Sequence, residues 1–189
     1  MGSEPSPRDE YGKLVSEFGP RTLAKTITLK MDFDMLNALV DLWYACNDVI
    51  CQRVSGLRHS RVFQGLSVGM LETACQAVPS QPQSTTSQGL DPKDGPLIVV
   101  ESYMTWKKAE EDDESMEKTV AGFLKNCVSL AQERHLAHRF IFPNYAWPTD
   151  DVMKGYGEQR LAVLHGTAQK WDPEGFFQTQ FVGGFTLSK

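Results

Sequence analysis

The chain has 189 residues, of which 41% are hydrophobic and 23% charged, with a formal net charge of −5. This length is enough for one domain with its own core, and the composition is ordinary for a soluble globular protein. The acidic balance argues against a nucleic-acid-binding module, and no apolar run approaches the roughly 18 residues that a membrane-spanning helix needs.

The first 20 residues are polar and contain Pro5, Pro7 and Pro20. This composition predicts a flexible N-terminal arm. The arm also lacks the apolar core of a secretory signal, so we expect a cytoplasmic protein. Residues 21–189 are expected to form a single domain.

Three segments have the sequence pattern of β-strands. Residues 21–30 alternate with period two and are rich in β-branched side chains, which predicts a strand with one buried face. Residues 57–70 alternate more weakly and are interrupted by two glycines. Residues 97–106, LIVVESYMTW, form the strongest predicted strand, and their alternation places Glu101 and Tyr103 on the same face.

Apolar residues at three- and four-residue spacing predict two long amphipathic helices. The first follows Asp32, which can cap its N-terminus, and extends to Ile50. The second begins in the acidic run 110–114, where negative charge suits the helix dipole, and its apolar stripe extends to Ala131.

Shorter features complete the predicted fold. A short helix is expected over 71–77 and a polar surface loop over 79–88. A helical pattern near the C-terminus extends to Trp171 and is expected to bury Leu161, Leu164, Ala168 and Trp171. Helices that alternate with antiparallel strands predict an α+β fold, with a single antiparallel sheet and helices packed mainly on one face.

The four cysteines form no Cys-x-x-Cys pair, and no histidine lies at metal-ligand spacing from any of them. We therefore expect free thiols, a reducing compartment and no metal site. His135 and His138 lie near a predicted helix end, where we expect helix-end cations rather than zinc ligands.

The last fifth of the chain carries an ordered series of short motifs. An Asn-Tyr pair is followed by Tyr-Gly, then by Arg-Leu inside a helical pattern, then by Asp-Pro, Gly and Phe. The matching residues are Asn144, Tyr145, Tyr156, Gly157, Arg160, Leu161, Asp172, Pro173, Gly175 and Phe177. In this order they resemble the C-terminal signature of berberine-bridge-enzyme-like, FAD-linked oxidoreductases. The ending Gly183-Gly184-Phe185 is similar to that of the fungal members.

The resemblance covers roughly residues 22–185 and implies the substrate-binding and C-terminal part of these oxidases, without their N-terminal FAD-binding domain. It implies FAD as the cofactor and places Asn144 and Tyr145 near the flavin. No glycine-rich phosphate loop follows a predicted strand, so we expect that this chain alone does not bind FAD tightly. From the residues alone, Asn144 could instead cap a turn and Tyr145 pack in a corner.

Three residues are candidates for acid–base catalysis. The resemblance implies that a strand such as 97–106 lines the substrate pocket, which makes Glu101 and Tyr103 candidates. A buried glutamate would have a raised pKa, which suits a general base. His59 is the third candidate. The alternative is that this face of the sheet is exposed, or that Glu101 pairs with a nearby arginine, Arg58 or Arg61.

Three functions remain open from the sequence. The first is a truncated FAD-linked oxidoreductase-like protein of fungal secondary metabolite biosynthesis, acting on a small aromatic or polyketide-like metabolite when a partner supplies the FAD domain. The second is a cofactor-independent cyclase or isomerase, including a pericyclic one. The third is a non-catalytic binding or scaffold protein. An apolar patch left by the missing domain would predict a homo-oligomer or a flavin-domain partner chain, with no nucleic-acid or membrane partner.

Overall fold

The computed structural model describes residues 21–52, 54, 56–77, 84–106, 113–180 and 184–187. The predicted N-terminal arm, the first half of the predicted loop over 79–88 and the start of the acidic run at 110 lie outside the described residues.

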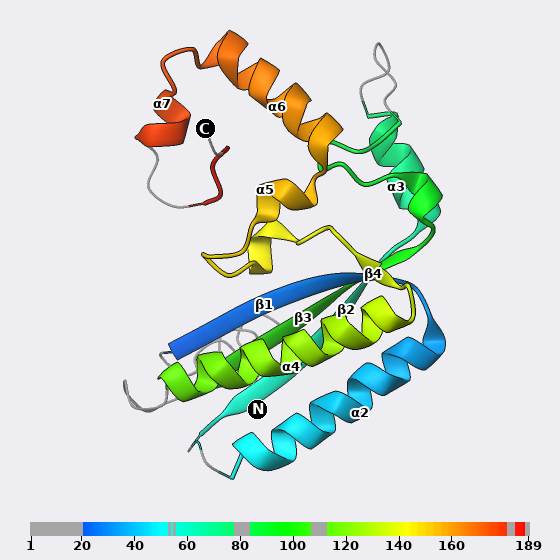
Figure 1. Cartoon of the computed structure of the whole chain (residues 1–189), viewed down its shortest axis with the longest axis vertical. Helices are drawn as coiled ribbons and strands as arrows, with labels where there is room; N and C mark the ends of the chain where they lie inside the picture. The colour runs from blue at the N-terminus through cyan, green and yellow to red at the C-terminus, as the bar shows by residue number, and fades with distance from the viewer. Residues whose placement is uncertain are drawn as a thin grey trace, which may run out of the picture.

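A four-stranded antiparallel sheet with strand order β2-β3-β1-β4 forms the centre of the fold (Figure 1). Its strands are β1 (Arg21–Lys30), β2 (Arg58–Leu66), β3 (Leu97–Trp106) and β4 (Ala137–His138). β3 pairs with β1 and β2 along its whole length, and every β3 residue except Tyr103 is buried. The predicted strands over 21–30 and 97–106 are confirmed with the same bounds.

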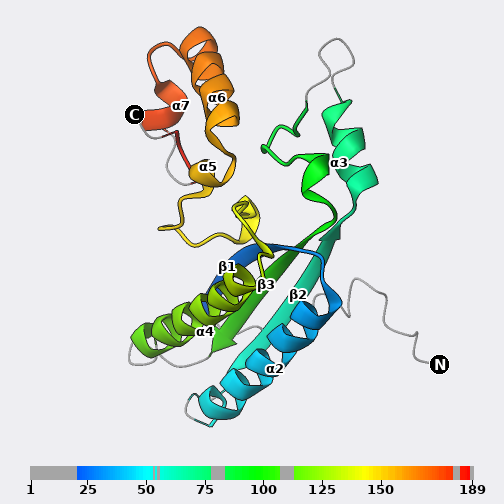
Figure 2. The same ribbon diagram turned by 45° about the vertical axis from the view of Figure 1, so that its right-hand side comes forward.

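Two long helices, α2 (Phe33–Ile50) and α4 (Asp113–Glu133), pack on the same face of the sheet (Figures 1 and 2). The carboxylate of Asp32 accepts a hydrogen bond of 2.7 Å from the backbone N–H of Met35 and caps α2, as predicted. The core between the sheet and the helices includes Leu23, Leu29, Leu39, Val100, Met104, Met116, Val120 and Cys127. The predicted α+β fold with a single antiparallel sheet is confirmed.

The second strand is shorter than predicted. β2 ends at Leu66, and α3 (Val68–Cys75) begins two residues later. The Ser67 hydroxyl caps α3 by accepting a hydrogen bond of 3.2 Å from the backbone N–H of Met70. Because Ser67 caps the helix, α3 begins at Val68. The alternating pattern had placed Val68 in the predicted strand over 57–70.

A second apolar cluster lies at the end of the sheet nearest α3. Its buried members are Leu71, Leu90, Leu97, Val99 and Phe140. The ring of Tyr156 stacks on the ring of Phe140, with 6.2 Å between centroids and an interplanar angle of 27°. This cluster joins the C-terminal segment to the sheet.

The C-terminal helical pattern is divided rather than continuous. It forms α5 (Val152–Gly155) and α6 (Glu158–Trp171), which are separated at Gly157, whose φ is 84°. α7 (Phe176–Thr179) follows. Arg160 is the only buried residue among those described in α6, and Trp171 is 74% exposed. Leu161, Leu164 and Ala168 are half-buried, so the prediction that this helix buries these three residues and Trp171 was wrong. α6 extends away from the sheet, which leaves its far end without a described core to pack on (Figure 1).

No described helix is both long enough and apolar enough to cross a membrane. The four cysteines are free thiols, with Cys127 buried and Cys51 exposed.

Candidate functional site

One face of the sheet, here called the Glu101 face, carries Thr26, Thr28, Glu101, Tyr103 and Thr105. It is opposite the face that α2 and α4 cover, because side chains alternate along β3 and the intervening residues belong to the helix-covered core. Thr26 of β1 lies directly across from Glu101 in the register. The shared face of Glu101 and Tyr103 follows the predicted alternation.

The carboxyl group of Glu101 is in a desolvated environment. The residue is 6% exposed, and burial raises the pKa of its carboxyl above the usual range for glutamate. The alternative of an exposed position for Glu101 is therefore wrong. Arg61 lies on the other face of β2, so it cannot pair with Glu101, whereas Arg58 shares the Glu101 face across from Thr105.

Three threonine hydroxyls on this face lack partners. The Oγ1 atoms of Thr26, Thr28 and Thr105 are buried, and within the described part of the chain none has a hydrogen-bond partner. Buried polar atoms without partners are uncommon in native proteins, and each calls for a physical explanation. These hydroxyls, together with the Glu101 carboxyl, make this buried face of the sheet polar.

His59 lies on the opposite face and belongs to a half-buried polar group between the sheet and α2. The indole N–H of Trp43 donates to Nδ1 of His59 over 3.1 Å, and Nε2 lies 3.0 Å from the Ser102 hydroxyl. Nδ1 also lies 2.5 Å from the Oδ1 atom of Asn47. An indole N–H can only donate and an amide oxygen can only accept, so the tautomer of His59 decides which of these two contacts Nδ1 makes.

This arrangement keeps His59 neutral. Burial, and secondarily the charge of Arg61, lower the pKa of His59 to about 3. His59 and Glu101 lie on opposite faces of the sheet, so the structure does not bring these two candidates together on one substrate. Glu101 and Tyr103 remain together, and His59 has the contacts of a structural residue.

Asn144 and Tyr145 lie in a short 3-10 helix, η2 (Pro143–Tyr145), which contacts β1. Asn144 is exposed, and Tyr145 is 36% exposed with its ring 5.4 Å from the ring of Phe142. Both side chains are accessible to a ligand. In the described part of the chain, no hydrogen bond joins either of them to Glu101.

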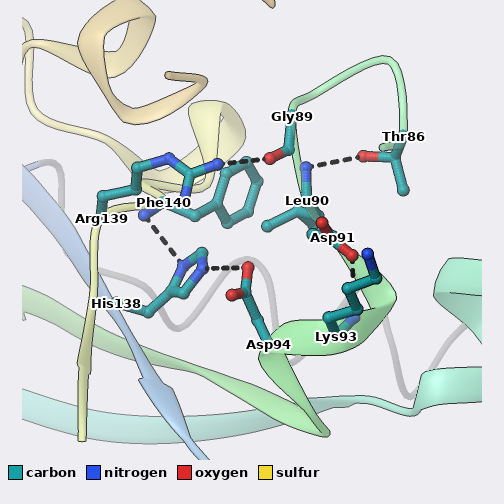
Figure 3. A network of polar contacts seen from close by, with 9 residues as sticks. All are labelled: Thr86, Gly89, Leu90, Asp91, Lys93, Asp94, His138, Arg139 and Phe140. Atoms are coloured by element: carbon teal, nitrogen blue, oxygen red, sulfur yellow. Dashed lines mark hydrogen bonds and ion pairs between the residues drawn. The ribbon is translucent and has the colours of Figure 1, made fainter. Parts of the chain in front are cut away.

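A polar network that the sequence did not indicate joins the segment before β3 to β4 (Figure 3). Nε2 of His138 donates to the Asp94 carboxylate over 3.0 Å, and Nδ1 accepts from the backbone N–H of Phe140 over 3.2 Å. The Arg139 guanidinium donates to the carbonyl of Gly89 over 2.6 Å. These bonds hold the second apolar cluster against the end of the Glu101 face.

His138 is therefore a half-buried strand residue with a side chain that is only 5% exposed, rather than the helix-end cation predicted. Burial lowers the pKa of its imidazole, and the hydrogen bond that it donates to Asp94 only partly opposes that shift. Among the described residues, no group of three or more His, Cys, Asp or Glu side chains could hold a metal ion.

Comparisons with known proteins give partial matches. The FAD-dependent monooxygenase FUP4 of Fusarium proliferatum is 28% identical over 170 residues, which are 89% of this chain and 32% of the relative. The FAD-dependent monooxygenase drtC of Aspergillus calidoustus is 35% identical over 95 residues, 50% of this chain and 18% of the relative. The oligopeptidase PhomG′ of Diaporthe leptostromiformis is 26% identical over 171 residues, 89% of this chain and 13% of the relative.

The chain is related to fungal FAD-dependent monooxygenases. It spans about a third or less of the length of the curated relatives it matches. No protein-family model matches the chain, and no solved structure matches it significantly.

The described residues do not fit the dinucleotide part of FAD. A diphosphate is commonly bound by free backbone N–H groups where a strand leads into a helix. Here the turn from β1 to α2 is capped by Asp32, and the turn from β2 to α3 is capped by Ser67. Each cap occupies an N–H group, and the carboxylate of Asp32 would also repel a phosphate.

A basic cavity at the start of α6 is the other place where a phosphate could bind. It has a volume of about 510 Å³ and is lined by Arg139, Lys154 and Arg160. The guanidinium groups of Arg139 and Arg160 already donate to the backbone carbonyls of Gly89 and Thr85. The acidic Glu158 shares the lining. The guanidinium groups that line this cavity are thus already engaged by backbone carbonyls, and an acidic side chain beside them opposes the binding of a phosphate.

Proposed function

We propose that this chain is the substrate-binding part of an FAD-linked oxidoreductase of fungal secondary metabolism, acting on a small aromatic or polyketide-like metabolite. The relatedness to fungal FAD-dependent monooxygenases supports the reaction class. One structural observation supports the proposed position of the substrate. A desolvated carboxyl group, Glu101, lies on the same face as three buried hydroxyls that lack partners.

In this proposal Glu101 is the general base. Burial moves the pKa of its carboxyl toward neutral pH. A general base is most effective when its pKa is near the pH of the reaction. The carboxylate takes the proton of a substrate hydroxyl, and the electron pair of the broken O–H bond stays on the substrate oxygen. Hydroxyls of Thr26, Thr28 and Thr105 bind polar groups of the substrate, and Tyr103 packs beside it on the same face.

FAD, when bound, supplies the redox chemistry. Because the described residues do not fit its dinucleotide, this chain alone holds FAD weakly in our proposal. A flavin-binding segment outside these residues completes the site, with Asn144 and Tyr145 on the flavin side. Four free thiols are consistent with a reducing, cytoplasmic setting.

The aromatic surface of α6 and α7 is the proposed contact for that flavin-binding segment. Trp171 is 74% exposed, Phe176 55% and Phe177 57%. Exposed aromatic clusters of this kind commonly mark contact surfaces. The relatives are about three times as long as the matched region or longer, which leaves a large segment to occupy this surface.

A second candidate function is favoured by the same carboxyl group. A desolvated general base can transfer a proton without a redox cofactor, as an isomerase or cyclase requires. The Glu101 face would then hold the reactive conformer of the substrate, and no flavin-binding segment would be needed.

The flavin content of purified protein tests the proposed function. We expect the chain alone to carry far less than one flavin per chain in the visible absorption spectrum. Joined to the part of the Fusarium relative that lies outside the match, it should bind flavin and oxidise a hydroxylated aromatic compound. Conversion of such a compound by the colourless chain alone would support the isomerase or cyclase instead. A flavin-loaded fusion that oxidises nothing would contradict both the substrate class and the proposed role.

A further inference from the structure

Arg61 carries a buried positive charge with no hydrogen-bond partner. All three of its guanidinium nitrogens are buried, and in the described chain none of them makes a hydrogen bond. The guanidinium stacks over the ring of Phe123, 4.0 Å from the ring centroid. Stacking satisfies the flat face of the group but none of its five N–H donors. A buried cation in this state is costly and needs an anion.

No described group near Arg61 supplies that anion. The thiols of Cys46 and Cys127 are the groups that raise the pKa of Arg61, and burial raises the pKa of Cys127 to about 12, so its thiol is protonated. His59 is neutral and already bonded to Trp43. Desolvation lowers the pKa of Arg61 only to about 10, so its guanidinium stays charged at neutral pH.

A cavity of about 440 Å³ opens beside Arg61 at the outer edge of β2. Its lining comes from α2 and β2 and consists of Val40, Trp43, Tyr44, His59, Ser60, Arg61 and Phe63. Tyr44 is 57% exposed and Phe63 is 37% exposed, so aromatic rings remain accessible from solvent. A concave, mostly aromatic lining with one charged group is typical of small-molecule sites, whose volumes are about 300–1,000 Å³.

We propose that this cavity binds a small aromatic carboxylate, with its carboxylate on the Arg61 guanidinium and its ring among Trp43, Tyr44 and Phe63. Arginine and a carboxylate match as two parallel hydrogen bonds, which would satisfy donors that now lack partners. The site lies on the sheet face opposite Glu101, so it is distinct from the proposed substrate site and does not depend on the proposed function.

Isothermal titration of the full chain with benzoate and 2-naphthoate tests this site, with 2-naphthamide as the neutral analogue. We expect at least one acid to bind, and 2-naphthamide to bind at least tenfold more weakly than 2-naphthoate. Arg61→Met should weaken the binding of the acid at least tenfold, and Arg61→Lys should weaken it less, because the charge remains while the paired hydrogen bonds are lost.

Arg58→Met is the matched control, because it removes the same side chain from the opposite face of the same strand. It should leave the affinity for the acid unchanged. If Arg61→Met does not fold, Arg61→Lys provides the comparison with Arg58→Lys. The proposal is overturned if neither acid binds, if acid and amide bind equally, or if the Arg61 and Arg58 variants behave alike.

Discussion

Replacing Gly89 by alanine is expected to lower the free energy of unfolding by about 4 kcal/mol, whereas Gly95→Ala should cost about 2 kcal/mol. Both glycines have a positive φ, 76° for Gly89 and 79° for Gly95. Alanine is therefore strained at either position, and the ψ of −174° at Gly95 belongs to a region that is essentially restricted to glycine. A Cβ at Gly89 would lie 1.9 Å from the carbonyl oxygen of Tyr156, but a Cβ at Gly95 meets nothing within 4 Å.

The clash at Gly89 should act on the junction between two distant parts of the chain. The carbonyl of Gly89 also accepts the hydrogen bond from Arg139, so a displaced backbone would lose that bond as well. Urea unfolding of the two variants measures the difference, and Gly95→Ala controls for the loss of glycine's conformational freedom. Equal costs for both substitutions would show that the segment around Gly89 does not pack on Tyr156.

Mild acid is expected to destabilise the wild-type protein through His59. The pKa of His59 is about 3 in the folded protein and 6.5 in the unfolded chain, so the unfolded chain binds the extra proton between these values. The contribution of His59 to the free energy of unfolding is fully present above its pKa in the unfolded chain, 6.5. This contribution decreases as the pH falls toward its pKa in the folded protein, about 3. At about pH 5 the loss is about 2 kcal/mol, because one pKa unit corresponds to about 1.4 kcal/mol.

The variant His59→Gln isolates this contribution, because glutamine can still form hydrogen bonds but does not titrate. The difference in unfolding free energy between wild type and variant should shrink by about 2 kcal/mol from near pH 7 to about pH 5. Subtracting the variant cancels the contributions of the carboxyl groups, which titrate in the same range. A difference that stays constant with pH would mean that His59 is solvated or charged in the folded state.

The strands and long helices were predictable because their local patterns are strong. Residues 21–30 and 97–106 alternate along their whole length, and the Asp32 cap is readable from the sequence. β4 was missed because it has only two residues, too few for a pattern. Trp171 lies on the apolar side of a predicted helix. Helical spacing alone, however, does not show whether another part of the protein packs against that side.

The sequence predicted which candidate residues share a face of the sheet only where both residues belong to the same strand. Glu101 and Tyr103 share a face because they are two residues apart. His59 was grouped with them wrongly, because its face depends on the register between β2 and β3, which pairs His59 with Met104. The buried Arg61 guanidinium without hydrogen-bond partners and the hydrogen bond between His138 and Asp94 both depend on contacts between distant parts of the chain. Local sequence patterns do not predict such contacts.

Methyl NMR can show whether the substrate binds on the Glu101 face. Titration with 2-naphthol should shift the threonine methyl signals of Thr26, Thr28 and Thr105 and leave the isoleucine methyls of Ile27 and Ile98, on the helix-covered face, unchanged. Glu101→Gln should weaken this binding at least tenfold. Shifts confined to the isoleucine methyls, or an affinity that Glu101→Gln does not change, would contradict the account.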